Sequence, residues 1–238
     1  MFFSFIGDAR LDDTAKMLLE LSISLGLRPS LALVPEVVAR ALNAREFEVE
    51  ESADHHDYVI SLHKIASYQG EEFAAKRYDC RLFLSRTPAF RSEVMDLADP
   101  SLWRKIFDLC DLWQVQRGGT SDSDHDRSAL ERCVKSASDL DLIPLGLFVN
   151  ETLIAFSIVG VLGNGHSICH FEKADARGFP GVYSFLRKQL AAVLIERGIE
   201  HMNLEQDLGV PGLRRSKTSY APVALLRKYN VKHKVDET

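Results

Sequence analysis

Residues 143–172 read IPLGLFVNETLIAFSIVGVLGNGHSICHFE, and this stretch decides the fold. Two apolar runs, 144–149 and 153–162, are separated by a short polar connection, and the glycine-containing turn 163–165 leads into a third run at 166–172. Short apolar runs bounded by turn residues are typical of antiparallel strands joined by hairpins. The stretch therefore predicts a three-stranded antiparallel meander.

The chain after the meander predicts a helix that returns the chain to the sheet. A glycine-bearing loop at 174–181 precedes a helix at 182–197, Gly198 ends that helix, and a strand follows at 199–204. The start of such a helix offers unpaired amides to a phosphate or an oxyanion. A further helix from Pro222 to about Tyr229 and a closing strand at 230–234 complete this part of the prediction.

The chain before the meander is mainly helical in pattern. The first helix, 12–25, has Met17, Leu18, Leu21 and Leu25 as its expected core stripe. The remaining expected elements are a short helix after Pro35, strands at 47–49 and 58–60, and helices at 71–84, from Pro100 to Gly118, and at 127–137. Helices and antiparallel strands in this order predict an α+β fold with a mixed sheet and flanking helices.

Composition excludes several classes of protein. The 238 residues are 46% hydrophobic and 26% charged, which is ordinary globular usage rather than that of a disordered or fibrous chain. The longest apolar run, 153–162, is about half of the ~20 residues that a membrane-spanning helix needs. We therefore expect no integral membrane segment. The four cysteines form no CxxC pair, so we expect reduced thiols and no metal site. Reduced thiols are typical of a cytoplasmic protein.

Charge is unevenly distributed along the chain. The segment 208–235 contains seven lysines and arginines and no acid, so its formal charge is +7, whereas the whole chain has a net charge of −5. We call residues 208–235 the basic segment. Such a segment is typical of a surface that binds phosphates, and the alternative is a solvated basic face.

The end of the meander and the chain after the next strand gather groups that can do acid–base chemistry. Glu172 ends one predicted strand, Glu205 and Asp207 follow the next, and Arg214 and Lys217 lie three residues apart. Carboxylates can remove a proton from an acceptor, and cations can stabilise an oxyanion. A structural network of ion pairs is the alternative, since such networks also cluster charges.

Several common motifs are absent from the sequence. No GxxxxGK[ST] or GxSxG motif occurs, which argues against the common nucleotide triphosphatases and α/β-hydrolases. The turn at 163–165 lacks the third glycine of a dinucleotide fingerprint and lies between strands.

The sequence resembles the C-terminal domain of phosphatidylglycerol lysyltransferases and the proteins grouped with it. The resemblance covers nearly the whole chain and is strongest in the last third, in NLEQDLGVPGLRRSKTSYAP at 203–222 followed by Lys228-Tyr229. Other matching pieces are Asp57-Tyr-Val, Gly70, Lys76-Arg77, Glu172-Lys173-Ala174 and Gly181-Val-Tyr183. The resemblance implies two halves similar to GNAT acyltransferases, as in Fem-type aminoacyltransferases, with a shortened half at 1–90 and a more complete half at 91–238.

The resemblance also implies an acyl transfer with no tightly bound cofactor. The donor is an aminoacyl-tRNA or an acyl-CoA, and the acceptor is a small molecule, a peptide or a lipid headgroup. Glu172, Glu205 or Asp207 is the expected base, and Tyr220 is a candidate acid. The expected substrate-binding residues are Lys76, Arg77, Lys173, Gly181, Tyr183, Arg214 and Lys217, of which Arg214, Lys217 and the amides of 181–183 would face the donor.

The loop before the helix at 182–197 favours aminoacyl-tRNA over acyl-CoA. The pyrophosphate of CoA needs backbone amides at a helix start, and glycines permit its close approach. Here Pro180 removes one N–H, and Arg177-Gly-Phe-Pro-Gly181 is out of register with the CoA pattern [QR]xxGx[GA]. A tRNA needs a broad positive surface, which the basic segment with Lys76 and Arg77 would supply. A hypothesis of another class is a catalytically inactive module that binds RNA or another polyanion through the basic segment.

Overall fold

The computed structural model describes residues 1–118 and 123–234, so the serine- and aspartate-rich loop that follows Gly118 lies partly outside the described residues. The helices are α1 Leu11–Ser24, α2 Glu36–Ala39, α3 Leu62–Ser67, α4 Ala74–Arg86, α5 Pro100–Arg117, α6 Ser123–Lys135, α7 Val182–Ile195 and α8 Pro211–Thr218. The strands are β1 Leu31–Pro35, β2 Phe47–Glu51, β3 Asp57–Ser61, β4 Arg91–Val94, β5 Leu142–Val149, β6 Thr152–Gly163, β7 His166–Ala174, β8 His201–Asn203, β9 Ala224–Leu226 and β10 Lys228–His233.

The chain forms two compact units. The first contains residues 1–59, 206–218 and the described residues from 223 onward, and the second contains residues 60–205 and 219–222. The expected division at residue 90 does not coincide with these units, because residues 60–90 belong to the second unit and residues 206–218 belong to the first. An origin from two GNAT-like halves divided near residue 90 stays a prediction.

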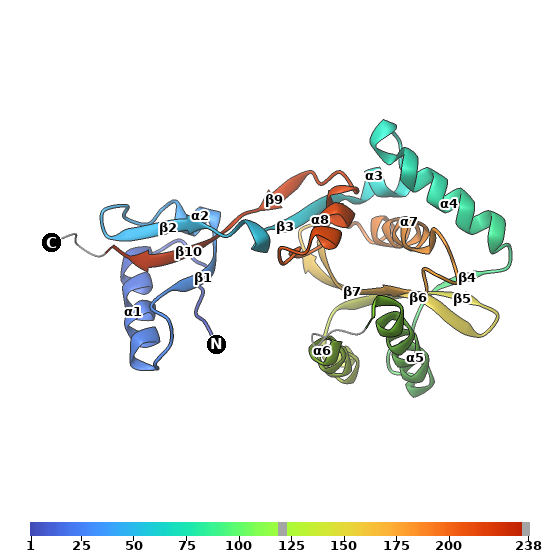
Figure 1. Ribbon diagram of the computed structural model, residues 1–238, viewed down its shortest axis with the longest axis horizontal. Coiled ribbons are helices and arrows are strands. Elements are labelled where there is room, and N and C mark those ends of the chain that lie inside the picture. The colour runs from blue at the N-terminus through green and yellow to red at the C-terminus, as the bar shows by residue number, and fades with distance from the viewer. Residues whose placement is uncertain (119–122, 235–238) are drawn as a thin grey trace. The chain divides into compact units, whose positions relative to one another are not determined.

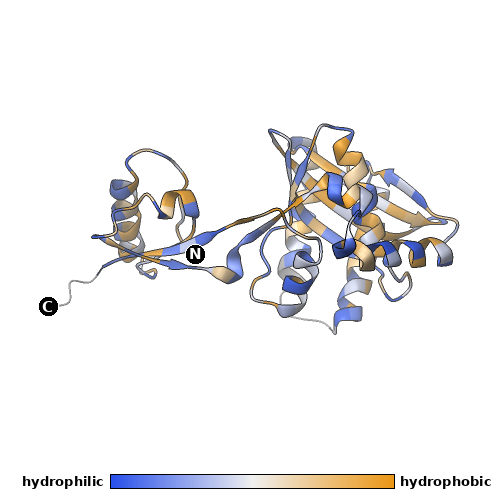
Figure 2. Cartoon of the chain, turned by 90° about the horizontal axis from the view of Figure 1, so that it is seen from above, coloured by the Kyte–Doolittle hydropathy of each residue, from blue (hydrophilic) through white to orange (hydrophobic). Residues whose placement is uncertain are grey.

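The second unit is built on the predicted meander. Strands β5, β6 and β7 pair antiparallel as expected, β4 adds to the outer edge of β5, and β8 pairs parallel to β7 after the α7 crossover. Figure 1 shows α5 and α6 on one face of this sheet and α7 on the other. Because both faces are covered, β5 and β6 are almost continuously apolar rather than alternating. Figure 2 shows these strands in the hydrophobic colour.

Helix α5 illustrates how the local sequence determines an element of this unit. Asp99 caps the helix, since its carboxylate accepts a hydrogen bond of 2.8 Å from the amide of Ser101, and Pro100 occupies the first turn. Gly118 ends the helix with a positive φ. Ile106 and Leu109, which helical spacing places on one face, are buried in the core between α5 and the sheet.

The first unit joins distant parts of the sequence. Strand β10, from the C-terminal region, lies between β1 and β2 and pairs antiparallel with both. Helix α1 lies along this sheet (Figure 1) and buries Ala15 and Leu19 against Leu31 and Val231. Strand β10 therefore joins β1 and β2 into one sheet.

Two sequence predictions are wrong in this unit. The expected core stripe of α1 faces outward at Met17, Leu21 and Leu25, because the helix turns its Ala15 and Leu19 face to the sheet. The helix predicted from Pro222 to Tyr229 is instead the strands β9 and β10. In β9, pairing with β3 places Ala224 opposite Val59, and this long-range pairing outweighs the local apolar pattern.

Candidate functional site

The parallel ladder between β7 and β8 ends before β7 does. Its last pair is Ile168 with Asn203, while β7 continues to Ala174. At the same level, His170 is the extra residue of a bulge, because Ile158 pairs with Phe171 and the next residue of β6 pairs with Cys169. Bulges bend a strand and redirect side chains, often beside active sites. Strand β7 therefore bulges at His170, just after its pairing with β8 ends.

His170 and Glu205 form an ion pair at this point. His170 Nδ1 lies 3.3 Å from Glu205 Oε1, and the two side chains are 38% and 43% exposed. The Glu205 backbone has a φ of 59°, and its amide donates a 2.7 Å hydrogen bond to Asn203 Oδ1. A carboxylate beside Nδ1 favours the proton on that nitrogen, which leaves Nε2 as the acceptor. The pair has the arrangement of a base held by a carboxylate.

Glu172 is held by Arg187 of α7 rather than being a free base. Arg187 Nη2 lies 2.5 Å from Glu172 Oε1, and Arg187 Nε lies 3.2 Å from Oε2. The Arg187 and Glu172 side chains are only 9% and 12% exposed. Burial disfavours the charged guanidinium, but the charge of Glu172 together with the smaller effects of neighbouring groups outweighs burial and raises the pKa of Arg187. Glu172 therefore fixes the orientation of a permanently charged guanidinium.

The Tyr220 ring contacts two cations. The centre of its ring is 3.8 Å from Lys76 Nζ of α4 and 4.1 Å from Arg187 Cζ. Its hydroxyl hydrogen bonds with the side chain of Ser184, whose Oγ donates a 2.7 Å bond to Asp79 Oδ2. Burial raises the pKa of Tyr220 to about 12. Lys76 and Arg187 thus both contact the ring of Tyr220. The role of Tyr220 as an acid stays a prediction.

The start of α7 packs closely against α4. A Cβ added to Gly181 would overlap the carbonyl oxygen of Asp79, and Gly181 has a φ of +85°. Only glycine tolerates both the conformation and the contact. The Asp79 carboxylate, which accepts from Ser184 in the first turn of α7, adds a negative charge at the end of the helix where a phosphate would bind. These contacts disfavour a pyrophosphate on the amides of 181–183.

Three other expected substrate-binding residues have partners within the second unit. Lys173 points to the α5 side of the sheet, 2.6 Å from Asp126 and 3.9 Å above the Trp113 ring, and it lines a pocket with room for about one water molecule. Tyr183 accepts a 2.8 Å hydrogen bond from Trp113 Nε1. Arg77 donates to the carbonyls of residues 68 and 70 and so supports that turn.

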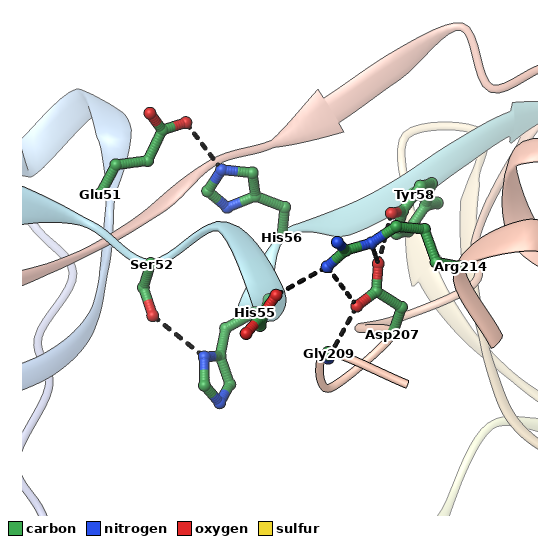
Figure 3. Close-up of polar contacts among 9 residues, drawn as sticks. Glu51, Ser52, His55, His56, Tyr58, Asp207, Gly209 and Arg214 are labelled. Carbon is green, nitrogen blue, oxygen red and sulfur yellow. Dashed lines mark hydrogen bonds and ion pairs between the residues drawn. The ribbon is translucent and has the colours of Figure 1, made fainter. Parts of the chain in front are cut away.

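Asp207 belongs to an ion-pair network in the first unit. Figure 3 shows its carboxylate between Tyr58 and Arg214, with distances of 2.5 Å to the Tyr58 hydroxyl and 2.7 Å to Arg214 Nε. The amide of Gly209 donates a third bond of 2.8 Å, and Arg214 also reaches Asp54 at 2.7 Å. The Arg214 hydrogen bond and the others lower the pKa of the buried Asp207 to about 2. Asp207 is therefore held as an anion by its neighbours, and its expected role as a base stays a prediction.

Acidic residues of the first unit neutralise much of the basic segment. Besides Arg214, Arg227 lies 3.5 Å from Glu51, Lys228 lies 2.6 Å from Asp57, and Lys232 lies 3.8 Å from Glu50. The Lys217 ammonium donates to the carbonyl of Gln206. These pairs follow from the register of β10 beside β2 and of β9 beside β3. Interactions within the chain, rather than a free phosphate-binding surface, account for most of these cations.

We expect the Asp207 network to make folding of the first unit sensitive to acid. The pKa of Asp207 lies below its ordinary value of 3.8, so its contribution is complete above that value and is lost as the pH falls toward about 2. The change Asp207→Asn should lower the free energy of unfolding at pH 7 by about 1.5–3 kcal/mol. Urea unfolding at a series of pH values from 2 to 7 measures both effects. A variant with the same stability and pH dependence as the wild type would contradict this assignment.

Among the described residues, the thiols and acids form no second candidate site. All four cysteines are free, and burial raises the pKa of Cys80 to about 11 and those of Cys110 and Cys169 to about 12, which disfavours thiolate chemistry. No group of three metal-ligating side chains occurs among the side chains that the structure describes, in residues 1–118 and 126–234.

Sequence reasoning did not identify His170 or Arg187 as site residues. His170 precedes Glu172 by two residues, and this spacing on a strand was the available signal. Arg187 stands inside the predicted helix at 182–197, and nothing local distinguishes it from a surface arginine. Only its pairing with Glu172 on the adjacent strand reveals it.

The comparisons with known proteins cover nearly the whole chain. A family model described as phosphatidylglycerol lysyltransferase, C-terminal, matches residues 1–232. No curated protein matches. A conserved protein of unknown function from Bacteroides thetaiotaomicron has a TM-score of 0.85 at 24% identity, over 97% of this chain and 78% of that one.

Two further solved structures have the same fold. L-PGS from Bacillus licheniformis has a TM-score of 0.61 at 14% identity and covers 94% of this chain and 73% of its own. FemX has a TM-score of 0.62 at 12% identity, over 97% and 80%. The expected GNAT-like α+β fold, a mixed sheet with flanking helices, is confirmed. Among the described helices, none has the length and hydropathy needed to cross a bilayer.

Proposed function

Because the chain belongs to the phosphatidylglycerol lysyltransferase C-terminal family and is thus an acyltransferase, we propose that it transfers an aminoacyl group from aminoacyl-tRNA to a hydroxyl or amino acceptor. The observation that carries the proposal is the group of side chains where the ladder of β7 and β8 ends. There His170 pairs with Glu205, and Glu172 orients Arg187 beside Tyr220. This donor would place the reaction in the cytoplasm.

The reaction needs a base for the acceptor, and His170 is our candidate. Its Nε2 takes the proton of the acceptor hydroxyl or amine as the acceptor attacks the carbonyl carbon of the donor ester. The bond from that carbon to the ribose oxygen then breaks, and the proton passes to the ribose oxygen that leaves. Glu205 keeps the imidazole in the tautomer that accepts the proton. Of the three carboxylates expected as bases, Glu205 thus acts through His170.

The packing of α7 supports aminoacyl-tRNA over acyl-CoA as the donor. Asp79 contacts Gly181 through its carbonyl oxygen and Ser184 through its carboxylate, at the place where CoA would need free amides. The basic segment lends less support than its charge suggests, because Arg214, Lys228 and other members are paired within the chain. For the same reason, we do not adopt the hypothesis of an inactive polyanion-binding module.

A paired binding and transfer experiment tests the donor. We expect purified protein to transfer a radiolabelled aminoacyl group from charged tRNA to an amine or hydroxyl acceptor. In a calorimetric titration, we expect no heat of binding with CoA or acetyl-CoA. Uncharged tRNA and heat-denatured protein are the controls. Micromolar binding of CoA, together with acetyl transfer and no reaction with charged tRNA, would replace the proposal with an acyl-CoA-dependent acyltransferase.

A further inference from the structure

The side chains around Tyr220 include two cations that have hydrogen-bond donors without an acceptor. Arg187 donates hydrogen bonds from Nε and Nη2 to Glu172, while its buried Nη1 has no hydrogen-bond acceptor among the described residues. Lys76 contacts the Tyr220 ring from α4 and forms no hydrogen bond or ion pair with the side chains described in residues 1–118 and 126–234. A buried donor that lacks an acceptor costs about 1–3 kcal/mol, so its presence calls for an explanation.

The two cations also repel each other. The pKa of Lys76 is lowered, first by burial and second by the charge of Arg187. The nearest acids are engaged elsewhere, since Glu172 binds the other nitrogens of Arg187 and Asp79 accepts from Ser184. An added anion would relieve the repulsion and would accept from both cations. The arrangement is therefore electrostatically complementary to one negative group.

Burial limits what that negative group can be. Arg187 and Tyr220 are 7% and 3% exposed, so we expect a small terminal group to reach them more easily than a phosphodiester with a substituent on each side. A carboxylate is planar, ends a molecule and accepts strong hydrogen bonds from guanidinium and ammonium groups. The Tyr220 ring adds a flat surface next to both cations.

We infer that Arg187 Nη1 and Lys76 Nζ bind the terminal carboxylate of a small acceptor, such as an amino acid or a short peptide. The inference rests on the proposed function for the identity of the carboxylate as part of the acceptor. It assigns the acceptor to carboxylate-bearing molecules rather than to lipid phosphodiesters. Arg187 and Lys76 are then specificity residues that position the acceptor.

Binding of acetate to the full-length protein tests the site without any assay of transfer. We expect saturable binding of acetate in a titration followed by the ¹⁵N resonances of arginine side chains, with dimethyl phosphate binding at least tenfold more weakly. The change Lys76→Met keeps the stem over Tyr220 and removes the charge, and it should weaken acetate at least tenfold. Lys64→Met, at an exposed lysine of α3, is the matched control and should bind acetate as the wild type does.

A second variant covers the buried arginine. The double change Glu172→Gln with Arg187→Gln removes both charges together, which avoids a buried unpaired ion, and it should abolish acetate binding in a protein with a native melting curve. Absence of acetate binding to the wild type, equal binding by Lys76→Met, or equal binding of dimethyl phosphate would each overturn the inference.

Transfer kinetics separate this inference from the proposed function. An amine acceptor with a free carboxylate should have a KM at least tenfold lower than its carboxamide, with a similar kcat, and Lys76→Met should remove the difference. Equal KM values for the two acceptors would refute the carboxylate site while leaving the transfer activity in place. Acetate binding by a protein that transfers no aminoacyl group would instead refute the proposed function and retain the site.

Discussion

The change His170→Ala should lower kcat for aminoacyl transfer by about 10²–10⁴-fold, the usual contribution of a positioned acid–base group. The reason is that in the proposed mechanism His170 offers Nε2 to the acceptor, while its Nδ1 faces Glu205 at 3.3 Å. The side chain is 38% exposed, so its removal creates no large cavity and should leave the melting temperature nearly unchanged. The measurement is single-turnover transfer from charged tRNA, beside a thermal melting curve.

Two other variants determine whether the effect belongs to the His170–Glu205 pair. Glu205→Gln should reduce the rate less than His170→Ala does, and the double variant should be no slower than His170→Ala, because both act on one proton transfer. His166→Ala, at an exposed histidine of the same strand that stacks on His201, should transfer at the wild-type rate. A His170→Ala protein with wild-type kcat would remove the base from the proposed mechanism.

The change Gly181→Ala should lower the free energy of unfolding of the second unit by about 3 kcal/mol or more. A positive φ costs a residue with a Cβ about 1–2 kcal/mol, and here the Cβ would also overlap the Asp79 carbonyl oxygen. Relief of this contact requires α4 and α7 to separate, which disturbs the bond from Ser184 to Asp79. Denaturant unfolding measures the loss.

Gly198→Ala is the matched control for this change. Gly198 lies in the turn after α7 with a φ of +77°, but an added Cβ would meet nothing within 4 Å. It should therefore cost only the conformational part, about 1–2 kcal/mol. Equal losses for the two variants would mean that the contact between Gly181 and Asp79 contributes nothing to stability.

The sequence by itself determined the elements whose signals are local. The meander at 143–172 is apparent because apolar runs alternate with turn residues, and α5 because Asp99, Pro100 and Gly118 mark its ends. The resemblance of 203–222 and earlier pieces to a known family likewise needs no structure, and the family match confirms it. These features depend on neighbours in the chain, which the sequence displays directly.

Only the tertiary structure decided which charges are free and which are paired. The acidic run of β2 and the basic segment are far apart in the sequence, yet β10 brings Lys232 beside Glu50 and so cancels charges that the sequence presents as separate. Asp207 and Glu172 look alike as carboxylates after strands, but Arg214 binds one and Arg187 the other. Ion pairing depends on distance in space, and long-range strand pairing sets that distance, so the candidate base His170 and the cations beside Tyr220 emerge only from the fold.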